Sequence, residues 1–408
     1  MKINSEIEIK KVCVVGLGYI GLPTAALLAN KGYQVVGVDI LPSVVEIINS
    51  GKIHIIEPEL AAFVASAINS GNLKAQLKPE EADIFIVSVP TPFKNEYQPD
   101  LKHVLDALNS IIPFIKPGNI IILESTSPIG TTEYIEKILI DNKIDVNSIY
   151  IAYCPERVLP GKIIEELISN DRIIGGINIK SSDIVASFYK TFIVGKVLKC
   201  DAKTAEMVKL IENTYRDVNI AFANELSMIS EKYNIDVWEV IKLANLHPRV
   251  NILNPGPGVG GHCIAVDPWF LVYDNKDDAN LIRQARLTNL KKTQWVISKI
   301  KEVVSKFKTQ KGRDPVIACM GLSYKPNIDD CRESSALNIT KELSQNFNIL
   351  AVEPNLKKVK DFQLTDINKA LEMADILIFL VKHNEFKEIK MKDVEDKIVL
   401  DYCGLYAE

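Results

Sequence analysis

Residues 12–21 read Val12-Cys-Val-Val-Gly16-Leu-Gly18-Tyr-Ile-Gly21, a short apolar run that leads directly into three glycines. The apolar run predicts a strand that is buried on both faces of a parallel sheet. The Ala- and Leu-rich stretch 23–30 predicts a helix, and residues 33–39 predict a second strand ending at Asp39. A strand, a Gly-x-Gly-x-x-Gly turn, a helix and a second strand are together typical of a dinucleotide-binding unit.

Each glycine of this turn has a physical reason. Gly16 permits the tight turn, and Gly18 lets the backbone approach a pyrophosphate whose charge is met by the helix N-terminus. Gly21 allows the helix to pack closely on the strand. Asp39 has the spacing expected of a carboxylate that binds ribose hydroxyls and repels a 2′-phosphate, so the predicted cofactor is NAD rather than NADP.

Strand and helix patterns alternate through the first half of the chain, which predicts a doubly wound parallel sheet. From about residue 201 the pattern is helical, with a long linking helix at 204–232, and the polar segment 308–315 reads as a linker. We therefore expect an α/β protein in three parts: an N-terminal Rossmann domain at 1–200, a central helical domain at 201–306 and a Rossmann-like α/β domain at 307–408. The strands expected beyond the first two are 84–89, 120–123, 149–152, 316–320, 349–352, 376–381 and 398–401.

Composition excludes several classes of protein. The net charge is −4 over 408 residues with no long basic run, so no nucleic-acid partner is expected. No apolar stretch reaches the roughly 18 residues that span a bilayer, and the N-terminus has no apolar signal-peptide core. We therefore expect a cytoplasmic protein without a membrane partner. The seven cysteines form no Cys-x-x-Cys pair, which argues against disulfides and against a metal site.

One cysteine has a context of its own. Cys263 ends the run Asn254-Pro-Gly-Pro-Gly-Val-Gly-Gly-His-Cys263, and Asp267 follows four residues later. A thiol behind a stretch of glycine and proline fits a flexible loop that wraps a bulky ligand and presents the sulfur to it. A thiol and a redox nucleotide in one chain suggest an oxidation that passes through a covalent thioester.

Other polar residues are candidates by position. Lys209 and Asn213 lie four apart on the predicted long helix and share a face. Glu156 follows a buried strand at the sheet edge where ligands bind. Three basic residues could clamp phosphates, namely Arg249, Lys325 and Arg332. Taken alone, each of these six residues is more typical of a solvated surface.

The whole chain resembles the UDP-glucose/GDP-mannose 6-dehydrogenase family. The motifs that carry the resemblance are, in order, Gly16-Leu-Gly-Tyr-Ile-Gly-Leu-Pro23, Val89-Pro-Thr-Pro92, Ser125-Thr126, Pro155-Glu156, Ala205-Glu-x-x-Lys209-x-x-x-Asn213, Gly258-Val-Gly-Gly-His-Cys263 and Lys325-x6-Arg332. The resemblance implies that the central domain forms a homodimer. It also implies that the C-terminal domain binds the nucleotide sugar. It also implies a four-electron oxidation of a sugar C6 alcohol to a carboxylate, with two NAD+ and no metal.

The resemblance also assigns roles to residues. As catalytic groups it implies Cys263, Lys209, Asn213, Asp267, Glu156 and Thr126. As cofactor contacts it implies Gly16, Gly18, Tyr19, Ile20, Gly21, Asp39, Pro90, Thr91, Thr126 and Arg332. As substrate contacts it implies Glu156, Arg157, Lys209, Asn213, Arg249, Asn254, Gly258, Gly260 and Lys325.

One departure narrows the substrate. Members that oxidise glucose carry a second carboxylate four residues after the first, where this chain has Pro160. In this respect the chain is similar to the branch that acts on UDP-N-acetylhexosamines, and segments 247–251 and 263–270 favour the mannosamine epimer over the alternative, the glucosamine epimer. Two alternatives are less well supported. A β-hydroxyacid dehydrogenase needs no thiol, whereas this chain presents Cys263. A catalytically silent nucleotide-sugar sensor should have lost Cys263, Lys209 or Asn213, and all three are present.

Overall fold

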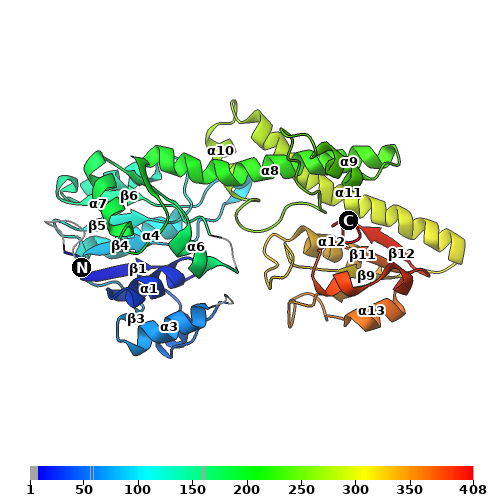
Figure 1. Ribbon diagram of the computed structural model, residues 1–408, viewed down its shortest axis with the longest axis horizontal. Helices are drawn as coiled ribbons and strands as arrows, with labels where there is room; N and C mark the ends of the chain where they lie inside the picture. The colour runs from blue at the N-terminus through cyan, green and yellow to red at the C-terminus, as the bar shows by residue number, and fades with distance from the viewer. Residues whose placement is uncertain (1–7, 56, 58, 159–160, 408) are drawn as a thin grey trace. The chain divides into compact units, whose positions relative to one another are not determined.

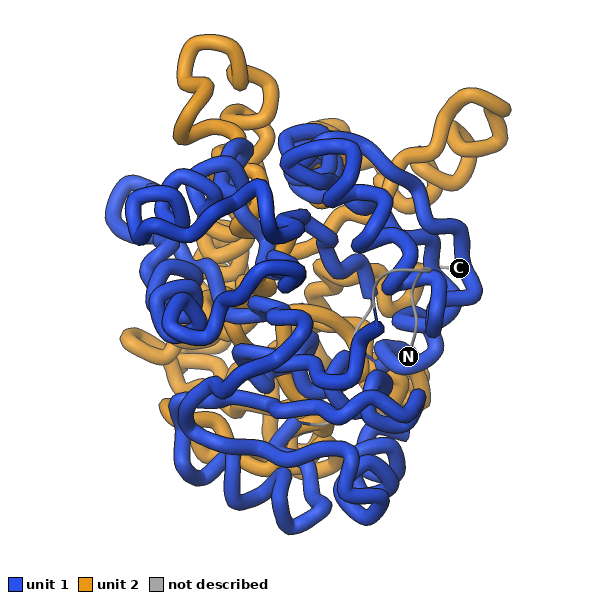
Figure 2. The backbone as a smooth tube through the Cα atoms, turned by 90° about the vertical axis from the view of Figure 1, so that its left-hand side faces the viewer, with its two compact units in different colours: residues 1–211 blue, residues 212–408 orange. Residues whose placement is uncertain are grey.

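The computed structural model describes residues 8–55, 57, 59–158 and 161–407. The chain divides into two compact units, residues 1–211 and 212–408 (Figures 1 and 2). The three-domain boundaries at 200 and 306 stay a prediction, and Pro160 lies outside the described residues. In the described part of the chain, no helix combines the length and the apolar character needed to cross a membrane.

The first unit is built on one sheet whose described strands run in the order β3-β2-β1-β4-β5-β6-β7-β8. Strands β1 to β6 pair in parallel as predicted, but β7 pairs with β6 antiparallel and β8 follows β7. The strands are β1 (Lys11–Val15), β2 (Gln34–Val38), β3 (Leu73–Gln76), β4 (Ile84–Val87), β5 (Ile120–Leu123), β6 (Tyr150–Tyr153), β7 (Arg172–Gly176) and β8 (Val197–Asp201).

Helices cover both faces of this sheet, as the alternation along β1 shows. Val12 and Val14 are buried with residues of α1, α3, α6 and α7, whereas Cys13 and Val15 are buried with residues of α4 and α5. The result is the three-layer, doubly wound arrangement that the sequence predicts (Figure 1). The helices are α1 (Gly21–Asn30), α2 (Pro42–Asn49), α3 (Leu60–Asn69), α4 (Lys102–Ile111), α5 (Thr131–Asp141), α6 (Ile163–Ser169) and α7 (Ile179–Tyr189).

The middle of the chain is helical. The predicted long helix at 204–232 is confirmed as α8 (Ala202–Lys232), which runs from the first unit into the second. It is followed by α9 (Val237–Ala244), α10 (Asp267–Asp274) and α11 (Asn280–Lys311). The linker expected from Lys308 is wrong in its first half, because α11 continues to Lys311. The helix ends at Gly312, whose left-handed φ of 68° suits a glycine.

The second unit contains a smaller sheet with the described order β10-β9-β11-β12, all parallel. Ile317 and Cys319 of β9 are buried with residues of α11 and α12, and Ala318 and Met320 with residues of α13. These elements are β9 (Val316–Met320), α12 (Ser335–Ser344), β10 (Asn348–Val352), α13 (Ile367–Met373), β11 (Ile376–Phe379) and β12 (Ile398–Asp401).

Candidate active site

The glycine turn of the first unit follows β1 and opens α1. Gly16 has φ +95°, and a Cβ there would lie 2.2 Å from the carbonyl oxygen of Ser88. A Cβ on Gly21 would lie 1.8 Å from the carbonyl oxygen of Gly16. Both positions therefore require glycine, Gly16 for its left-handed φ and its packing on Ser88, and Gly21 for the packing of the turn itself.

Gly18 is different, because the protein's own packing does not explain it. Gly18 is exposed, and a Cβ built there meets nothing within 4 Å. Ile20, the residue before α1, provides no side-chain cap for the helix N-terminus. Open space over uncapped N–H groups fits a bound pyrophosphate.

Asp39 directly follows β2 at the same edge of the sheet and is partly exposed. Its Oδ2 accepts the N–H of Leu17 at 3.1 Å, and its Oδ1 accepts the N–H of Leu41 at 3.0 Å. The carboxylate thus also fastens the glycine turn, a role that the spacing alone does not predict. With only part of its hydrogen-bonding capacity used, it fits a ribose diol of NAD as well.

The segments after β4 and β5 reach this edge too. The strand order reverses between β1 and β4, which is where open α/β sheets bind ligands. Pro90 and Thr91 follow β4, and the backbone N–H of Val89 donates to the Oγ of Ser125 at 2.9 Å. Thr126, directly after Ser125, is partly buried. The structure therefore gathers the predicted cofactor residues of the first unit along one sheet edge.

Glu156 follows β6 and is not a surface charge, since it is only 6% exposed. Arg172 on β7 donates to its Oε2 at 2.5 Å, and the N–H of Arg157 donates to its Oε1 at 2.7 Å. The guanidinium of Arg157 itself donates to the carbonyl of Asp171. A buried carboxylate that is held by one guanidinium and one N–H has a fixed orientation and a counter-charge.

Lys209 and Asn213 lie one turn apart on α8, and both are partly buried. Asn213 donates from Nδ2 to the Oδ2 of Asp267 at 2.6 Å. Asp267 is 3% exposed and begins α10, and its N–H donates to the carbonyl of Cys263 at 2.8 Å. The thiol of Cys263 is exposed. Three predicted catalytic residues of the second unit are thus linked by direct contacts.

The glycine loop before Cys263 is fastened to the helices beside it. The N–H of Gly256 donates to the Oδ1 of Asn224 on α8 at 2.8 Å, and Thr293 on α11 donates to the carbonyl of Pro257 at 2.9 Å. A Cβ on Gly258 would lie 2.2 Å from the Oγ1 of Thr293. Close packing on Thr293 therefore accounts for the glycine at position 258, and the expected flexibility of the loop stays a prediction.

The same loop packs on the segment that carries Lys325 and Arg332. A Cβ on Gly260 would lie 2.6 Å from the carbonyl of Glu333, and the N–H of Gly261 donates to the carbonyl of Arg332 at 3.1 Å. The guanidinium of Arg332 forms an ion pair with Asp330 at 2.6 Å. The backbone of the thiol loop and that of the predicted phosphate-binding segment are therefore in contact.

Two predicted substrate residues lie at the surface of the second unit. Asn254 and Arg249 are both exposed, and the N–H of Arg249 donates to the Nδ1 of His247 at 3.3 Å. Their assignment to a substrate comes from the resemblance and stays a prediction.

Comparison with known families decides what kind of protein carries these groups. Three models of one family match successive parts of the chain: its NAD binding domain matches residues 10–193, its central domain 203–291 and its UDP binding domain 318–408. The chain belongs to the UDP-glucose/GDP-mannose dehydrogenase family. It is therefore an NAD-dependent dehydrogenase, as the sequence analysis expects.

Individual relatives of this dehydrogenase cover nearly its full length. It is 51% identical to a UDP-N-acetyl-D-mannosamine dehydrogenase of Campylobacter jejuni, over 97% of this chain and 100% of that protein. It is 46% identical to an NDP-N-acetyl-D-galactosaminuronic acid dehydrogenase of Ralstonia nicotianae, over 98% of this chain and 97% of that protein. The solved UDP-D-ManNAc dehydrogenase of Pyrococcus horikoshii superposes with a TM-score of 0.90 at 37% identity, over 97% of this chain and 96% of that one.

The structure of this dehydrogenase adds two residues that sequence reasoning missed, Arg172 and Glu124. Glu124 ends β5, is 4% exposed and accepts the hydroxyl of Tyr189 at 2.7 Å. Burial, and then the charge of Glu156, raise the pKa of Glu124 to about 7. A signal for Arg172 is present in the sequence, since it is a lone charge in the otherwise apolar strand β7.

Proposed function

We propose that this dehydrogenase oxidises the C6 alcohol of UDP-N-acetyl-D-mannosamine to the uronate, for use in a surface polysaccharide. The observation that carries the proposal is the exposed Cys263, tied through its backbone to Asp267 and through Asp267 to Asn213. A single oxidation of an alcohol needs no thiol, whereas a second oxidation requires an adduct of the aldehyde that can release a hydride, and a thiol forms such an adduct. The choice of sugar is supported by the relatives from Campylobacter jejuni and Pyrococcus horikoshii.

NAD+, when bound, supplies the acceptor for each of the two hydrides. The first oxidation converts the alcohol to an aldehyde. The thiolate of Cys263 adds to the aldehyde carbon and forms a C–S bond, and the carbonyl oxygen becomes the oxyanion of a thiohemiacetal. This adduct still carries a hydrogen on carbon and collapses to a thioester when that hydrogen leaves as hydride. Water then adds and releases the thiol, so each sugar consumes one water and releases three protons.

The roles proposed for the remaining groups are those that the resemblance to the family implies. Lys209 and the amide of Asn213 donate hydrogen bonds to the oxyanion, which stabilises the charge that develops there. Asp267 holds Asn213 in place through their 2.6 Å hydrogen bond. Asp267 and Glu156, with Thr126, handle the protons and the hydrolytic water. The ion pair with Arg172 keeps Glu156 oriented for this role.

One set of residues is proposed to bind NAD and another to bind the UDP-sugar. NAD is held by the turn Gly16–Gly21 with Asp39, by Pro90, Thr91 and Thr126 after the next strands, and by Arg332. The UDP-sugar is held by Arg157, Arg249, Asn254, Gly258, Gly260 and Lys325 together with the catalytic groups. The close contact between the glycine loop and residues 324–335 supports a common site for the second-unit members of this set.

A homodimer in the cytoplasm belongs to the same proposal. On α8, three large side chains are spaced by seven residues and exposed: Tyr215 by 67%, Phe222 by 51% and Ile229 by 44%. This spacing places them on one face of the helix, which supports pairing with a second copy. Light scattering should give twice the 45.5 kDa mass of the chain, and a monomer would contradict the pairing.

A substrate panel tests the proposed sugar. We expect kcat/KM for UDP-N-acetylmannosamine to exceed that for UDP-N-acetylglucosamine and UDP-N-acetylgalactosamine by about 10- to 100-fold, since an epimer changes roughly 1–3 kcal/mol of contacts. A higher value for either competitor would replace mannosamine by that sugar. The galactosamine arm is included because of the relative from Ralstonia nicotianae.

A further inference from the structure

The smaller sheet repeats the glycine turn of the larger one. Gly321 follows β9 with φ +94°, and its N–H donates to the carbonyl of Val352 at 2.8 Å. Glu353 at the end of β10 accepts the N–H groups of Leu322 and Ser323 on Oε2, at 2.8 and 2.9 Å. A glycine turn with a carboxylate after the second strand is the arrangement that binds ribose in dinucleotide-binding units.

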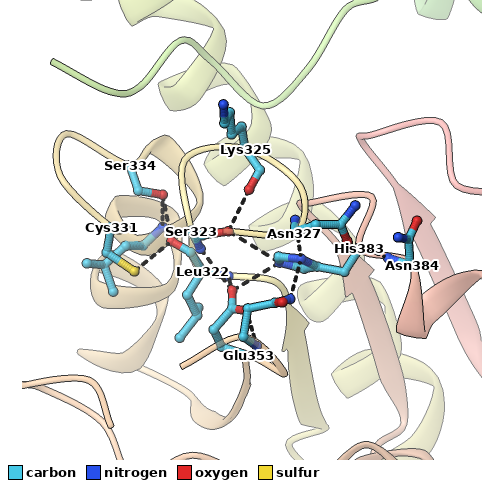
Figure 3. A network of polar contacts seen from close by, with 11 residues as sticks. Leu322, Ser323, Lys325, Asn327, Cys331, Ser334, Glu353, His383 and Asn384 are labelled. Carbon is cyan, nitrogen blue, oxygen red and sulfur yellow. Dashed lines mark hydrogen bonds and ion pairs between the residues drawn. The ribbon is translucent and has the colours of Figure 1, made fainter. Parts of the chain in front are cut away.

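Glu353, however, has more partners within the fold than Asp39, which accepts two backbone N–H groups. It is 4% exposed, its Oε1 accepts the N–H of Asn355 at 2.9 Å, and its Oε2 lies 3.1 Å from the Nε2 of His383. Burial by itself would raise the pKa of Glu353, but the hydrogen bonds that the carboxylate accepts, first from His383 and then from the backbone of Leu322 and Asn355, contribute to a pKa that is lowered. Glu353 therefore remains a carboxylate whose acceptor sites are taken by the protein (Figure 3).

His383 occupies the centre of this network and is fully buried. Its Nδ1 accepts the backbone N–H of Asn327 at 3.0 Å, so in the neutral ring the hydrogen lies on Nε2. That nitrogen faces Glu353 at 3.1 Å and the Oγ of Ser323 at 3.3 Å. The hydroxyl of Ser323 in turn donates to the carbonyl of Lys325 at 2.8 Å (Figure 3).

Two of these contacts end on the segment 324–333, at the N–H of Asn327 and the carbonyl of Lys325. Asn327 has a left-handed φ of 61°, and its Oδ1 accepts the N–H of Asn384 at 2.9 Å, next to His383 in the chain. The segment thus has two anchors on the residues after β11, one to the ring of His383 and one to the following backbone. Lys325 is itself held at its carbonyl by the hydroxyl of Ser323, and it lies two residues before Asn327, which is held by His383.

We propose that His383 is a positioning residue. Its hydrogen bonds connect the glycine turn of the smaller sheet to the segment that carries Lys325 and Arg332 and hold that segment in place. The inference rests on the proposed function, which assigns these two residues to the UDP-sugar and to cofactor phosphate. His383 touches neither ligand, and it acts through the backbone of residues 325–327.

Two substitutions of His383 distinguish the roles of its two ring nitrogens. Asparagine places an oxygen near the position of Nδ1 and can still accept the N–H of Asn327, whereas glutamine places a donor near Nε2 and leaves that N–H unpaired. Without that acceptor the segment is held less firmly, so we expect His383→Gln to weaken UDP binding about tenfold, which is about 1.4 kcal/mol, and His383→Asn to stay within about threefold. The probe is UDP alone, titrated calorimetrically into the full-length protein.

A matched control removes a buried hydroxyl of the same unit outside the network. Thr340 is fully buried on α12 and donates to the carbonyl of Ala336, so Thr340→Val reports the effect of a destabilised unit on UDP binding. We expect it to bind UDP as the wild type does. If His383→Gln does not fold, Ser323→Ala replaces it, because this change removes only the hydroxyl that holds the carbonyl of Lys325.

The outcomes separate the two proposals. A wild-type protein that does not bind UDP would overturn the proposed function and this inference with it. Wild-type affinity in His383→Gln, or equal losses in the glutamine and asparagine variants, would overturn the positioning role alone. A loss in the glutamine variant that asparagine rescues, at unchanged affinity in Thr340→Val, is the result that the structure predicts.

Discussion

Glu124 should make the stability of the first unit depend on pH. Its pKa is raised from the model-compound value of 4.5 to about 7 by burial and by Glu156. Between these values the unfolded chain releases the proton and the folded protein keeps it, so the free energy of unfolding falls as pH rises. At about 1.4 kcal/mol per pH unit, the loss amounts to about 3 kcal/mol by pH 8.

Glu124→Gln removes this dependence. Glutamine keeps the oxygen that accepts the hydroxyl of Tyr189 and resembles the protonated acid, so the variant should be as stable as the wild type at pH 5 and more stable at pH 8. Hydrogen exchange of β5 and β6 amides in the full-length protein measures the opening free energy at both pH values. Tryptophan fluorescence is unsuitable here, because Trp238, Trp269 and Trp295 all lie in the second unit.

The exposed Glu165 on α6 offers a matched control, since Glu165→Gln changes the same charge at the surface of the same unit. We expect it to follow the wild type at both pH values. Opening free energies of Glu124→Gln that run parallel to those of the wild type from pH 5 to pH 8 would refute the reasoning, because they would mean that Glu124 titrates alike in the folded and unfolded chain.

Three further predictions concern other parts of the chain. Gly18→Ala should leave the melting temperature unchanged and weaken NAD+ binding about tenfold or more. Gly21→Ala should lower the melting temperature, because its Cβ would lie 1.8 Å from a carbonyl oxygen. Calorimetry measures the melting temperature and the NAD+ affinity of each variant. Burial lowers the pKa of Lys292 to about 7, so the unfolding free energy of the wild type should rise from pH 7 to pH 10, and tryptophan-detected urea unfolding should show no such rise in Lys292→Met. Cys263→Ala should abolish acid formation while NAD+ binds as in the wild type, and near-normal turnover would remove the covalent step.

Much of the fold is predictable because buried parallel strands are apolar runs and helices have a clear periodicity. The strands β3, β7 and β8 are missed, since each contains charged or glycine residues, such as Lys74, Arg172 and Lys199. The end of α11 was placed too early because Lys308 lies in a polar stretch that reads equally well as helix surface.

The candidate site is predictable where a residue's role is local and unpredictable where it depends on pairing. Gly21 serves the turn in which it lies, because its Cβ would meet the carbonyl of Gly16, so the motif alone explains it. The partner of Glu156 depends on β7 running antiparallel beside β6, which no local pattern shows. Likewise, Gly260 is explained by its contact with Glu333, more than seventy residues later in the chain.

The number of NADH molecules formed per sugar tests the central claim most directly. A limiting amount of UDP-N-acetylmannosamine is incubated to completion with excess NAD+ and the purified protein, and NADH is read from its absorbance. A thioester on Cys263 predicts two NADH per sugar, together with the uronate as the only sugar product. One NADH per sugar, with the aldehyde as product, would contradict the account.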